Sequence, residues 1–201
     1  MRGPSLRQAQ WRPHVNGLNA PAALRHWLTG GGSLTAKLKA HSQAFRVQCL
    51  HQHTARCLND EAAAIGMHQP GRVWEREVLL RCDNTPVVFA HTVVPMSSTA
   101  TDWPLFSALG ERSLGSTLFG DPMVRRGVLE YARLRSGHPL MQRARAALGL
   151  DQAQEPILYA RRCLYRRHQG LLLVTEVFLP TVLALRPHAT TTTTITGDQL
   201  R

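Results

Sequence analysis

Apolar and polar residues alternate with a period of two in several stretches of the chain, and this pattern predicts β-strands. The first strand begins with Phe45, Val47 and Cys49, which alternate with polar residues. The turn pair Asp83-Asn84 separates two further stretches and gives the signal of a β-hairpin. The other predicted strands span residues 74–82, 86–94, 159–167 and 171–179.

Proline, glycine and capping residues mark the ends of the predicted helices. Ser33 follows three glycines and can cap a helix. Asp121 and Pro122 predict a helix that runs to about Arg135, because Asp is a good cap and Pro suits the first turn. Gly149 ends the last predicted helix. The predicted helices span residues 21–28, 34–40, 104–109, 121–135 and 139–148.

The order of these elements predicts an α+β fold, with a single antiparallel β-sheet flanked by helices. A chain of 201 residues is long enough for one core. We expect a loosely ordered N-terminal arm over residues 1–20, one domain over residues 21–185 and a Thr-rich, disordered tail over residues 186–201. Residues 151–156 are expected to form a linker.

The charge of the chain points to an anionic partner. The formal net charge is +11, and of the 24 lysines and arginines only Lys37 and Lys39 are lysines. Arginine favours planar, bidentate contacts with carboxylates and phosphates. Nucleic acid, a membrane surface and a small anion all remain open on charge alone. A group of arginines lacks a recognition-helix pattern and is expected to form a solvated basic face; its members are Arg125, Arg126, Arg133, Arg135, Arg143 and Arg145.

Several classes of protein are disfavoured. The longest apolar run, residues 171–185, is short for a membrane span and contains Glu176, so no stable membrane insertion is expected. The arginines near the N-terminus are not followed by an apolar segment typical of a signal peptide. The four cysteines are too scattered for a disulfide scaffold, which favours a reduced, cytoplasmic protein.

Arg76 is a candidate binding residue. On the predicted strand it shares a face with Trp74, Val78 and Leu80, and it is the only charge on that face. A buried guanidinium needs a partner, because an unpaired buried charge is costly. Two interpretations stay open: an internal ion pair with an acid on a neighbouring strand, or a carboxylate-binding arginine that lines a pocket.

Glu176 is a candidate proton donor. Both faces of its predicted strand are apolar, and burial among apolar side chains disfavours the charged form of a carboxyl group. A protonated carboxyl can act as a general acid at neutral pH. Alternatively, Glu176 simply pairs with Arg76.

Two other motifs are weaker. Cys49, His51, His53 and Cys57 could suggest zinc, but they lack the C-x2-C spacing. Cys49, His51 and His53 are also expected on one face of a strand, an arrangement that suits tetrahedral coordination of a zinc ion poorly. No metal is therefore expected. The glycines at 30–32 follow a predicted helix and no Lys-Ser/Thr pair comes after them, which disfavours a nucleotide loop.

In their order along the chain, several blocks resemble the bacterial chorismate lyases of ubiquinone synthesis. The resemblance runs from about residue 21 to residue 182. The blocks are residues 27–35 (WLTGGGSLT), 74–80 (WEREVLL), 92–95 (TVVP) with 114–119 (LGSTLF), and 172–180 (LLVTEVFLP). Arg161-Arg162 matches a further basic pair of the family.

The resemblance implies helices that enclose a buried ligand site on the sheet. It implies an enzyme without a cofactor, which converts chorismate to 4-hydroxybenzoate and pyruvate in the first committed step of ubiquinone synthesis. By resemblance, Arg76 holds the ring carboxylate, and Glu176 meets the hydroxyl and ether oxygens at the other end of the ligand. Leu114 and Leu34 contact the ligand, and Leu34 stands where the best-known member has Met.

We therefore expect a monomeric, cytoplasmic lyase whose small-molecule partners are chorismate and 4-hydroxybenzoate, with no nucleic-acid partner. Glu176 is expected to protonate the departing ether oxygen, and the acceptor of the ring proton stays open between water and a carboxylate of the substrate. The segment from Ser33 to Ala40 is expected to move for product release. The alternative is a non-catalytic, aromatic-acid-binding sensor domain of the same fold. The presence of both Arg76 and Glu176, without a helix-turn-helix pattern, favours the enzyme.

Overall fold

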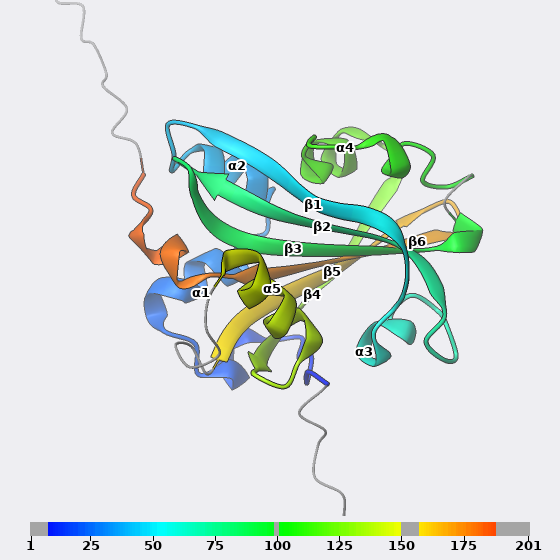
Figure 1. The fold of residues 1–201 in the computed structure, drawn as a ribbon, viewed down its shortest axis with the longest axis horizontal. Coiled ribbons are helices and arrows are strands. Elements are labelled where there is room, and N and C mark those ends of the chain that lie inside the picture. The colour runs from blue at the N-terminus through cyan, green and yellow to red at the C-terminus, as the bar shows by residue number, and fades with distance from the viewer. Residues whose placement is uncertain (1–7, 99–100, 150–156, 188–201) are drawn as a thin grey trace, which may run out of the picture.

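A computed structural model describes residues 8–98, 101–149 and 157–187 of the chain. In this part of the chain, six strands form one antiparallel sheet in the order β1-β2-β3-β6-β5-β4 (Figure 1). The strands are β1 (Phe45–Arg56), β2 (Arg72–Cys82), β3 (Thr85–Pro95), β4 (Val124–Arg135), β5 (Ile157–Arg167) and β6 (Gly170–Phe178). The predicted α+β fold with a single antiparallel sheet is confirmed.

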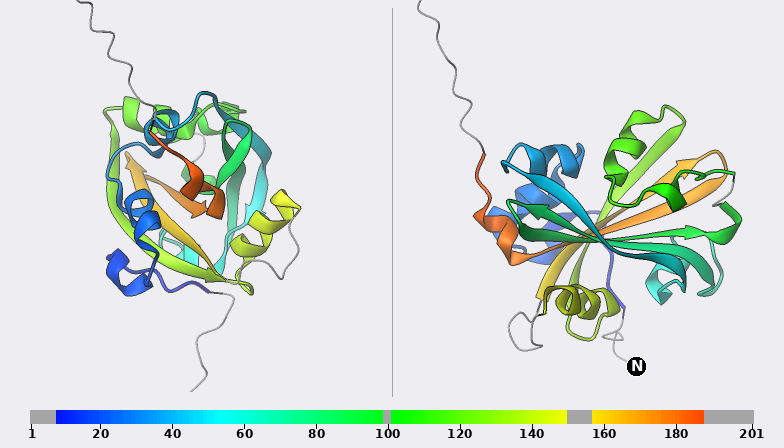
Figure 2. Two further views of the ribbon diagram at one scale, coloured as in Figure 1. Left: turned by 90° about the vertical axis from the view of Figure 1, so that its left-hand side faces the viewer. Right: turned by 45° about the horizontal axis from the view of Figure 1, so that its top comes forward.

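The sheet consists of two three-stranded halves, each built from strands that follow one another in the chain. The first half is β1-β2-β3, and the second is β4-β5-β6. They meet where β3 pairs with β6, with Ala90 opposite Glu176 and Thr92 opposite Val174. The sheet is strongly curved, as the views along and across it show (Figure 2).

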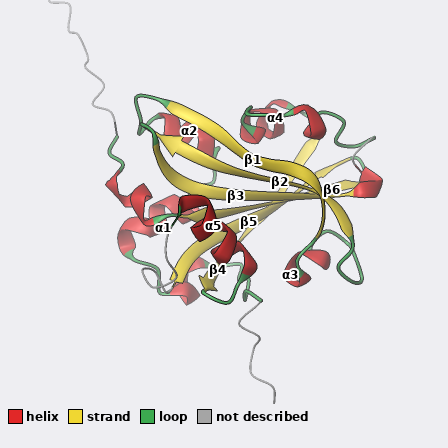
Figure 3. Ribbon diagram, viewed as in Figure 1, coloured by secondary structure: helices red, strands yellow, loops and turns green. Residues whose placement is uncertain are grey.

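Short helices surround the sheet (Figure 3). The α-helices are α1 (Ala22–Thr29), α2 (Leu34–Lys39), α3 (Asn59–Ala62), α4 (Leu114–Gly120) and α5 (Pro139–Leu148). The 3-10 turns are η1 (Val15–Leu18), η2 (Met96–Ser98), η3 (Phe106–Ala108) and η4 (Pro180–Ala184). Helix α5 packs Leu140 and Met141 into a core with Leu79, Phe89 and Val177 of the sheet. None of the described helices combines the length and the apolar character needed to cross a membrane.

Two of the predicted helix boundaries rest on caps that the structure shows. Ser33 Oγ accepts a hydrogen bond from Ala36 N at the start of α2. Gly149 ends α5 in the left-handed conformation, with φ 64°. The predicted helix 104–109 is reduced to the single turn η3.

The prediction of a helix over residues 121–135 is wrong, because strand β4 occupies most of this segment. Asp121 does accept a hydrogen bond from a backbone N–H, that of Met123, but it closes a turn that leads into the strand. A register shift between Arg126 and Leu129 puts a β-bulge at Gly127 and Val128. The bulge interrupts the two-residue alternation of the strand. Val124, Val128, Tyr131 and Ala132 consequently have the three- and four-residue spacing of one face of a helix.

The structure describes residues 8–20 of the predicted N-terminal arm, and these lie against the sheet. Arg12 and Tyr131 exchange two backbone hydrogen bonds of 2.9 and 2.8 Å. Trp11 Nε1 donates to Asp60 Oδ2 at 3.0 Å, and Leu18 is buried. Residues 1–7, the predicted linker 151–156 and most of the predicted tail lie outside the described residues, so the division into arm, domain and tail stays a prediction.

Candidate functional site

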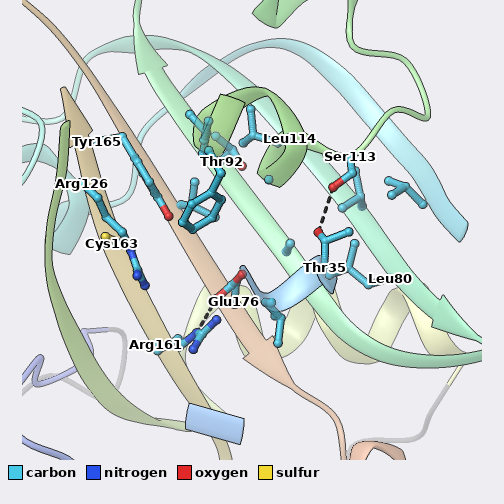
Figure 4. Close-up of a pocket in the computed structure, with 18 of the residues that line it drawn as sticks. Thr35, Leu80, Thr92, Ser113, Leu114, Arg126, Arg161, Cys163, Tyr165 and Glu176 are labelled. Atoms are coloured by element: carbon cyan, nitrogen blue, oxygen red, sulfur yellow. Dashed lines mark hydrogen bonds and ion pairs between the residues drawn. The ribbon is translucent and has the colours of Figure 1, made fainter. Parts of the chain in front are cut away.

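A pocket lies between one face of the sheet and the helices α2 and α4 (Figure 4). The space between its walls is about 650 Å³ when the open solvent at its mouth is included. All four residues singled out from the sequence line it: Arg76, Glu176, Leu34 and Leu114. The structure thus brings together residues that are up to 142 positions apart in the chain, between Leu34 and Glu176.

Strand alternation points polar side chains of five strands, β2 to β6, into the pocket. Arg76 of β2 lies opposite Thr92 of β3, and both line the pocket. Across the junction of the two halves, Glu176 of β6 lies opposite Arg161 of β5. Arg126 of β4 completes the row. Each strand therefore contributes a side chain to one continuous polar floor.

Arg76 is 2% exposed and carries its charge into the pocket wall. One of its terminal nitrogens, Nη2, donates to the carbonyl oxygens of Gly110 and Arg112, at 2.8 and 3.0 Å. Within the described ranges, no carboxylate lies within ion-pair distance of Arg76, and its Nε has no hydrogen-bond partner. Burial lowers the pKa of Arg76, but a guanidinium stays protonated in proteins. The internal ion pair that was one interpretation of Arg76 is therefore not formed.

The partner of Glu176 is Arg161. Arg161 Nε donates to Glu176 Oε2 at 2.5 Å, so the interpretation in which Glu176 pairs with Arg76 is wrong. The Nη1 of Arg161 donates to the carbonyl oxygens of Trp27, Leu28 and Gly30, which fixes the guanidinium at the end of α1. An adjacent guanidinium favours the ionised carboxylate. Glu176 therefore has a guanidinium partner within the protein, although its apolar strand suggested a carboxyl group surrounded by apolar side chains alone.

Three further polar groups of the pocket were not found from the sequence: Arg126, Cys163 and Tyr165. Arg126 Nη1 donates to Gly31 O, and within the described residues no carboxylate pairs with this guanidinium. Burial raises the pKa of the Cys163 thiol and of the Tyr165 phenol, so both stay neutral. Arg126 was missed because residues 121–135 were predicted as a helix and Arg126 was assigned to a solvated basic face, whereas the segment is mostly strand β4.

Helices α2 and α4 close the pocket with their N-terminal residues. Leu34 and Leu114, the first residues of these helices, line the cavity. Thr35 Oγ1 and Ser113 Oγ lie 2.8 Å apart and form a hydrogen bond between the two segments (Figure 4). Among the described residues, the side-chain groups close enough together to share a metal ion lie outside this pocket; they involve His51, His53, Glu75, Glu77 and His91.

Comparisons with known proteins agree with this arrangement. The family model "Chorismate lyase" matches residues 5–186. A "Probable chorismate pyruvate-lyase" of Cupriavidus metallidurans is 47% identical over 177 residues, which are 88% of this chain and 82% of that relative. One of Ralstonia nicotianae, with the same description, is 48% identical over 162 residues, or 80% of this chain and 83% of that relative.

Solved structures show the same fold at low sequence identity. The effector domain of PhnF from Mycobacterium smegmatis superposes with a TM-score of 0.53 and 18% identity, over 75% of this chain and 90% of that chain. This likeness concerns the fold alone. The family match, which covers nearly the whole chain, and the relatives at 47–48% identity decide the family: the chain belongs to the chorismate lyases.

Proposed function

We propose that this protein is a cytoplasmic chorismate lyase, which eliminates pyruvate from chorismate and leaves 4-hydroxybenzoate, the first committed step of ubiquinone synthesis. The family membership and the similarity to relatives described as probable chorismate pyruvate-lyases support this reaction. We further propose that the enzyme works as a monomer, needs no cofactor and has no nucleic-acid partner.

The charge pattern of the pocket supports a substrate with two carboxylates. Arg76 and Arg126 both line the pocket, and in the described part of the chain neither is neutralised by a carboxylate. Chorismate carries one carboxylate on its ring and one on its enolpyruvyl group. We assign the ring carboxylate to Arg76 and the enolpyruvyl carboxylate to Arg126. This pair of unneutralised guanidiniums is the observation that carries the proposal, since charge-assisted hydrogen bonds are strong where water is excluded.

The bond changes of the elimination suit an ionised Glu176. A base takes the proton from C4 of the ring, and the electron pair of that C–H bond forms the C3–C4 double bond of the aromatic ring. The C3–O bond breaks, and its electron pair leaves with the enolpyruvyl oxygen. Glu176 takes the proton in this scheme and returns it to the enolpyruvate, which becomes pyruvate. The ion pair with Arg161 supports this role of Glu176 over the expected role as an acid that starts out protonated.

The guanidinium of Arg161 is placed to stabilise the negative charge that develops on the departing oxygen. It is held by three backbone carbonyls and by Glu176, so it needs no rearrangement during the reaction. Apolar residues around the polar row, including Leu34 and Leu114, contact the ring and keep water out. Since aromatisation drives the reaction, orientation and charge stabilisation are the main tasks of the protein.

The test is incubation of the purified protein with chorismate and measurement of both products. Equal amounts of 4-hydroxybenzoate and pyruvate are expected, with no requirement for an added metal or cofactor. The Arg76→Ala variant serves as the control that separates this activity from a contaminating lyase. Tight binding of 4-hydroxybenzoate without any turnover of chorismate would instead identify a sensor-type binding domain.

A further inference from the structure

A β-bulge in β1 sends two histidines to the face of the sheet opposite the pocket. Cys49 pairs with Val78, but His51 pairs with Glu77, so Leu50 is an extra residue between two registers. Cys49 packs with the pocket-side core, whereas His51 and His53 share the other face with Glu75 and Glu77. The expectation that Cys49, His51 and His53 share one face is therefore wrong.

On this opposite face, the imidazoles converge on a carboxylate. His53 lies opposite Glu75 in the register, and the rings of His51 and His53 are 4.4 Å apart between centroids. His51 Nε2 is 3.0 Å from Glu75 Oε1. Each of the three side chains offers a ligand atom within 4.8 Å of the other two.

We propose that His51, His53 and Glu75 form a binding site for a divalent transition-metal ion of the Zn²⁺ class. Two imidazoles and one carboxylate are a common zinc ligand set, and a fourth position is left for water. Ligands about 2 Å from one tetrahedral ion lie roughly 3.3 Å apart, so the side chains must close by about 1.5 Å at most. His53 is exposed and the His51 side chain is 34% exposed, so both rings can rotate to do this.

The surroundings of the three ligands hold them in position. His51 Nδ1 lies 3.7 Å from Glu77 Oε2, and a carboxylate on the second nitrogen of a ligating imidazole orients the ring. Arg143 Nη1 donates to Glu75 Oε2 at 2.9 Å and to Glu77 Oε1 at 2.7 Å. Arg143 thus holds the two carboxylates in place and leaves the Oε1 of Glu75 facing His51.

A neighbouring group of side chains, Glu75, Glu77 and His91, is less suited to a metal ion. His91 is fully buried, with Nδ1 3.0 Å from Glu77 Oε1 and Nε2 2.9 Å from Glu61 Oε1. Burial opposes its charge, but the carboxylates of Glu61 and Glu77 raise the pKa of His91 to about 10. A protonated imidazole has no lone pair for a metal, so the outer group with His51 and His53 is the better site.

The experiment is a zinc titration of untagged, full-length protein that has been freed of metal with a chelator. Isothermal titration with ZnCl₂ should show one site, and Co²⁺ should give the visible absorption of a four-coordinate ion. His53→Ala and His51→Ala should each weaken zinc binding at least about 10-fold, because loss of a residue that only hydrogen-bonds to a metal ligand already lowers metal affinity by about that factor. His26→Ala, which removes an exposed histidine on α1, is the matched control and should bind as the wild type does.

Both histidine variants change side chains at least partly exposed to solvent, so loss of folding is readily excluded by circular dichroism. Binding that is unchanged in His51→Ala and His53→Ala would overturn the site, as would a wild-type protein that takes up no Zn²⁺ or Co²⁺. The proposal does not depend on the reaction in the pocket, and turnover of chorismate does not enter the test.

Discussion

Arg161 and Glu176 lie directly opposite each other on β5 and β6, and their side chains are joined by a 2.5 Å hydrogen bond from Nε to Oε2. The pair sits on the floor of the pocket, beside the two arginines that lack a carboxylate partner. One carboxylate and one guanidinium are thus committed to each other before any ligand binds. The guanidiniums of Arg76 and Arg126 have no such partner among the described residues, so their charge is available to an anionic ligand.

Replacing Glu176 by Gln should lower kcat far more than it raises KM. Gln keeps the shape and can still accept the hydrogen bond from Arg161, but it cannot take a proton from the ring. A loss of roughly 10²-fold or more in kcat is expected for removal of an acid–base group. Steady-state kinetics with chorismate measure the split, and Glu130→Gln, which alters an ion pair with Arg162 outside the pocket, is the control. An unchanged kcat would contradict the proton-transfer role of Glu176. Glu176 could then serve only to orient the ligand.

Replacing Arg76 by Ala should act mainly on binding, because this guanidinium is buried and unneutralised in the pocket wall. Charge-assisted hydrogen bonds are worth about 1.5–3 kcal/mol, so KM should rise roughly 10- to 100-fold. Arg76→Lys keeps the charge but loses the planar fork, and it should recover only part of the affinity. Arg125→Ala removes an exposed positive charge outside the pocket lining and controls for the general loss of electrostatic attraction. Unchanged substrate affinity in Arg76→Ala would exclude the anchoring role.

Replacing Ser113 by Ala should speed the release of 4-hydroxybenzoate. The hydrogen bond between Thr35 Oγ1 and Ser113 Oγ joins the two segments that close the pocket. One such bond is worth about 0.5–1.5 kcal/mol, so the dissociation rate should rise roughly 2- to 10-fold. Stopped-flow release of the product measures this rate. Ser116→Ala is the matched control, since its hydroxyl donates to a carbonyl within the same helical segment; equal rates in both variants would show that the contact with Thr35 does not limit release.

Asp60 should make the stability of the fold depend on pH in the acid range. Burial opposes its charge, but hydrogen bonds from His138 and Trp11 hold the pKa of Asp60 below its ordinary value of 3.8. A lowered pKa in the folded state contributes stability above 3.8, and this contribution is lost as the pH falls through the lowered value. Asp60→Asn should therefore cost about 1–3 kcal/mol at neutral pH.

The measurement is urea unfolding of Asp60→Asn and of the wild type at neutral pH and at about pH 3. The difference between the two proteins should shrink at the lower pH, because the stability that the lowered pKa of Asp60 contributes declines once the pH falls below the ordinary value of 3.8. Asp121→Asn is a suitable control, because the Asp121 carboxylate is likewise paired, with Arg167, but is more exposed to solvent than that of Asp60. A difference that stays constant with pH would assign the effect to the shape of the side chain and not to its charge.

The sequence was sufficient for the central strands and for the residues that keep a regular alternation. Arg76 and Glu176 lie on strands β2 and β6 as predicted, and both line the pocket, as the resemblance to the family implied. The partner of Glu176, Arg161, could not be predicted, because the sequence of a strand does not specify its register with the neighbouring strand. Periodicity gave no way to choose between Arg76 and Arg161.

Several residues whose position was predicted wrongly lie next to a bulge, which changes the phase of the strand. At Gly127 a side chain would meet the backbone oxygen of Leu164 at 2.9 Å, so glycine allows β4 to approach β5 closely at its bulge. Arg126 and Leu129 lie on either side of this bulge, and both line the pocket. In a regular strand, residues three positions apart would point to opposite faces. The same effect at Leu50 moved His51 and His53 away from Cys49. A single inserted residue reverses the faces of all that follow, and a pattern read from one sequence does not reveal it.

The division of the sheet into two halves has a consequence for how the protein folds. Each half pairs strands that are neighbours in the chain. The pairing of β3 with β6 instead brings together Val93 and Leu173, which are separated in the chain by β4 and β5. Distant pairings form late, because the loop they close costs more entropy. Arg76 comes from the early half and Arg126, Arg161 and Glu176 from the other, so the pocket does not exist until the two halves dock. A dianion that bridges Arg76 and Arg126 would bind only after the two halves have docked. It would therefore raise the free energy of unfolding of the protein.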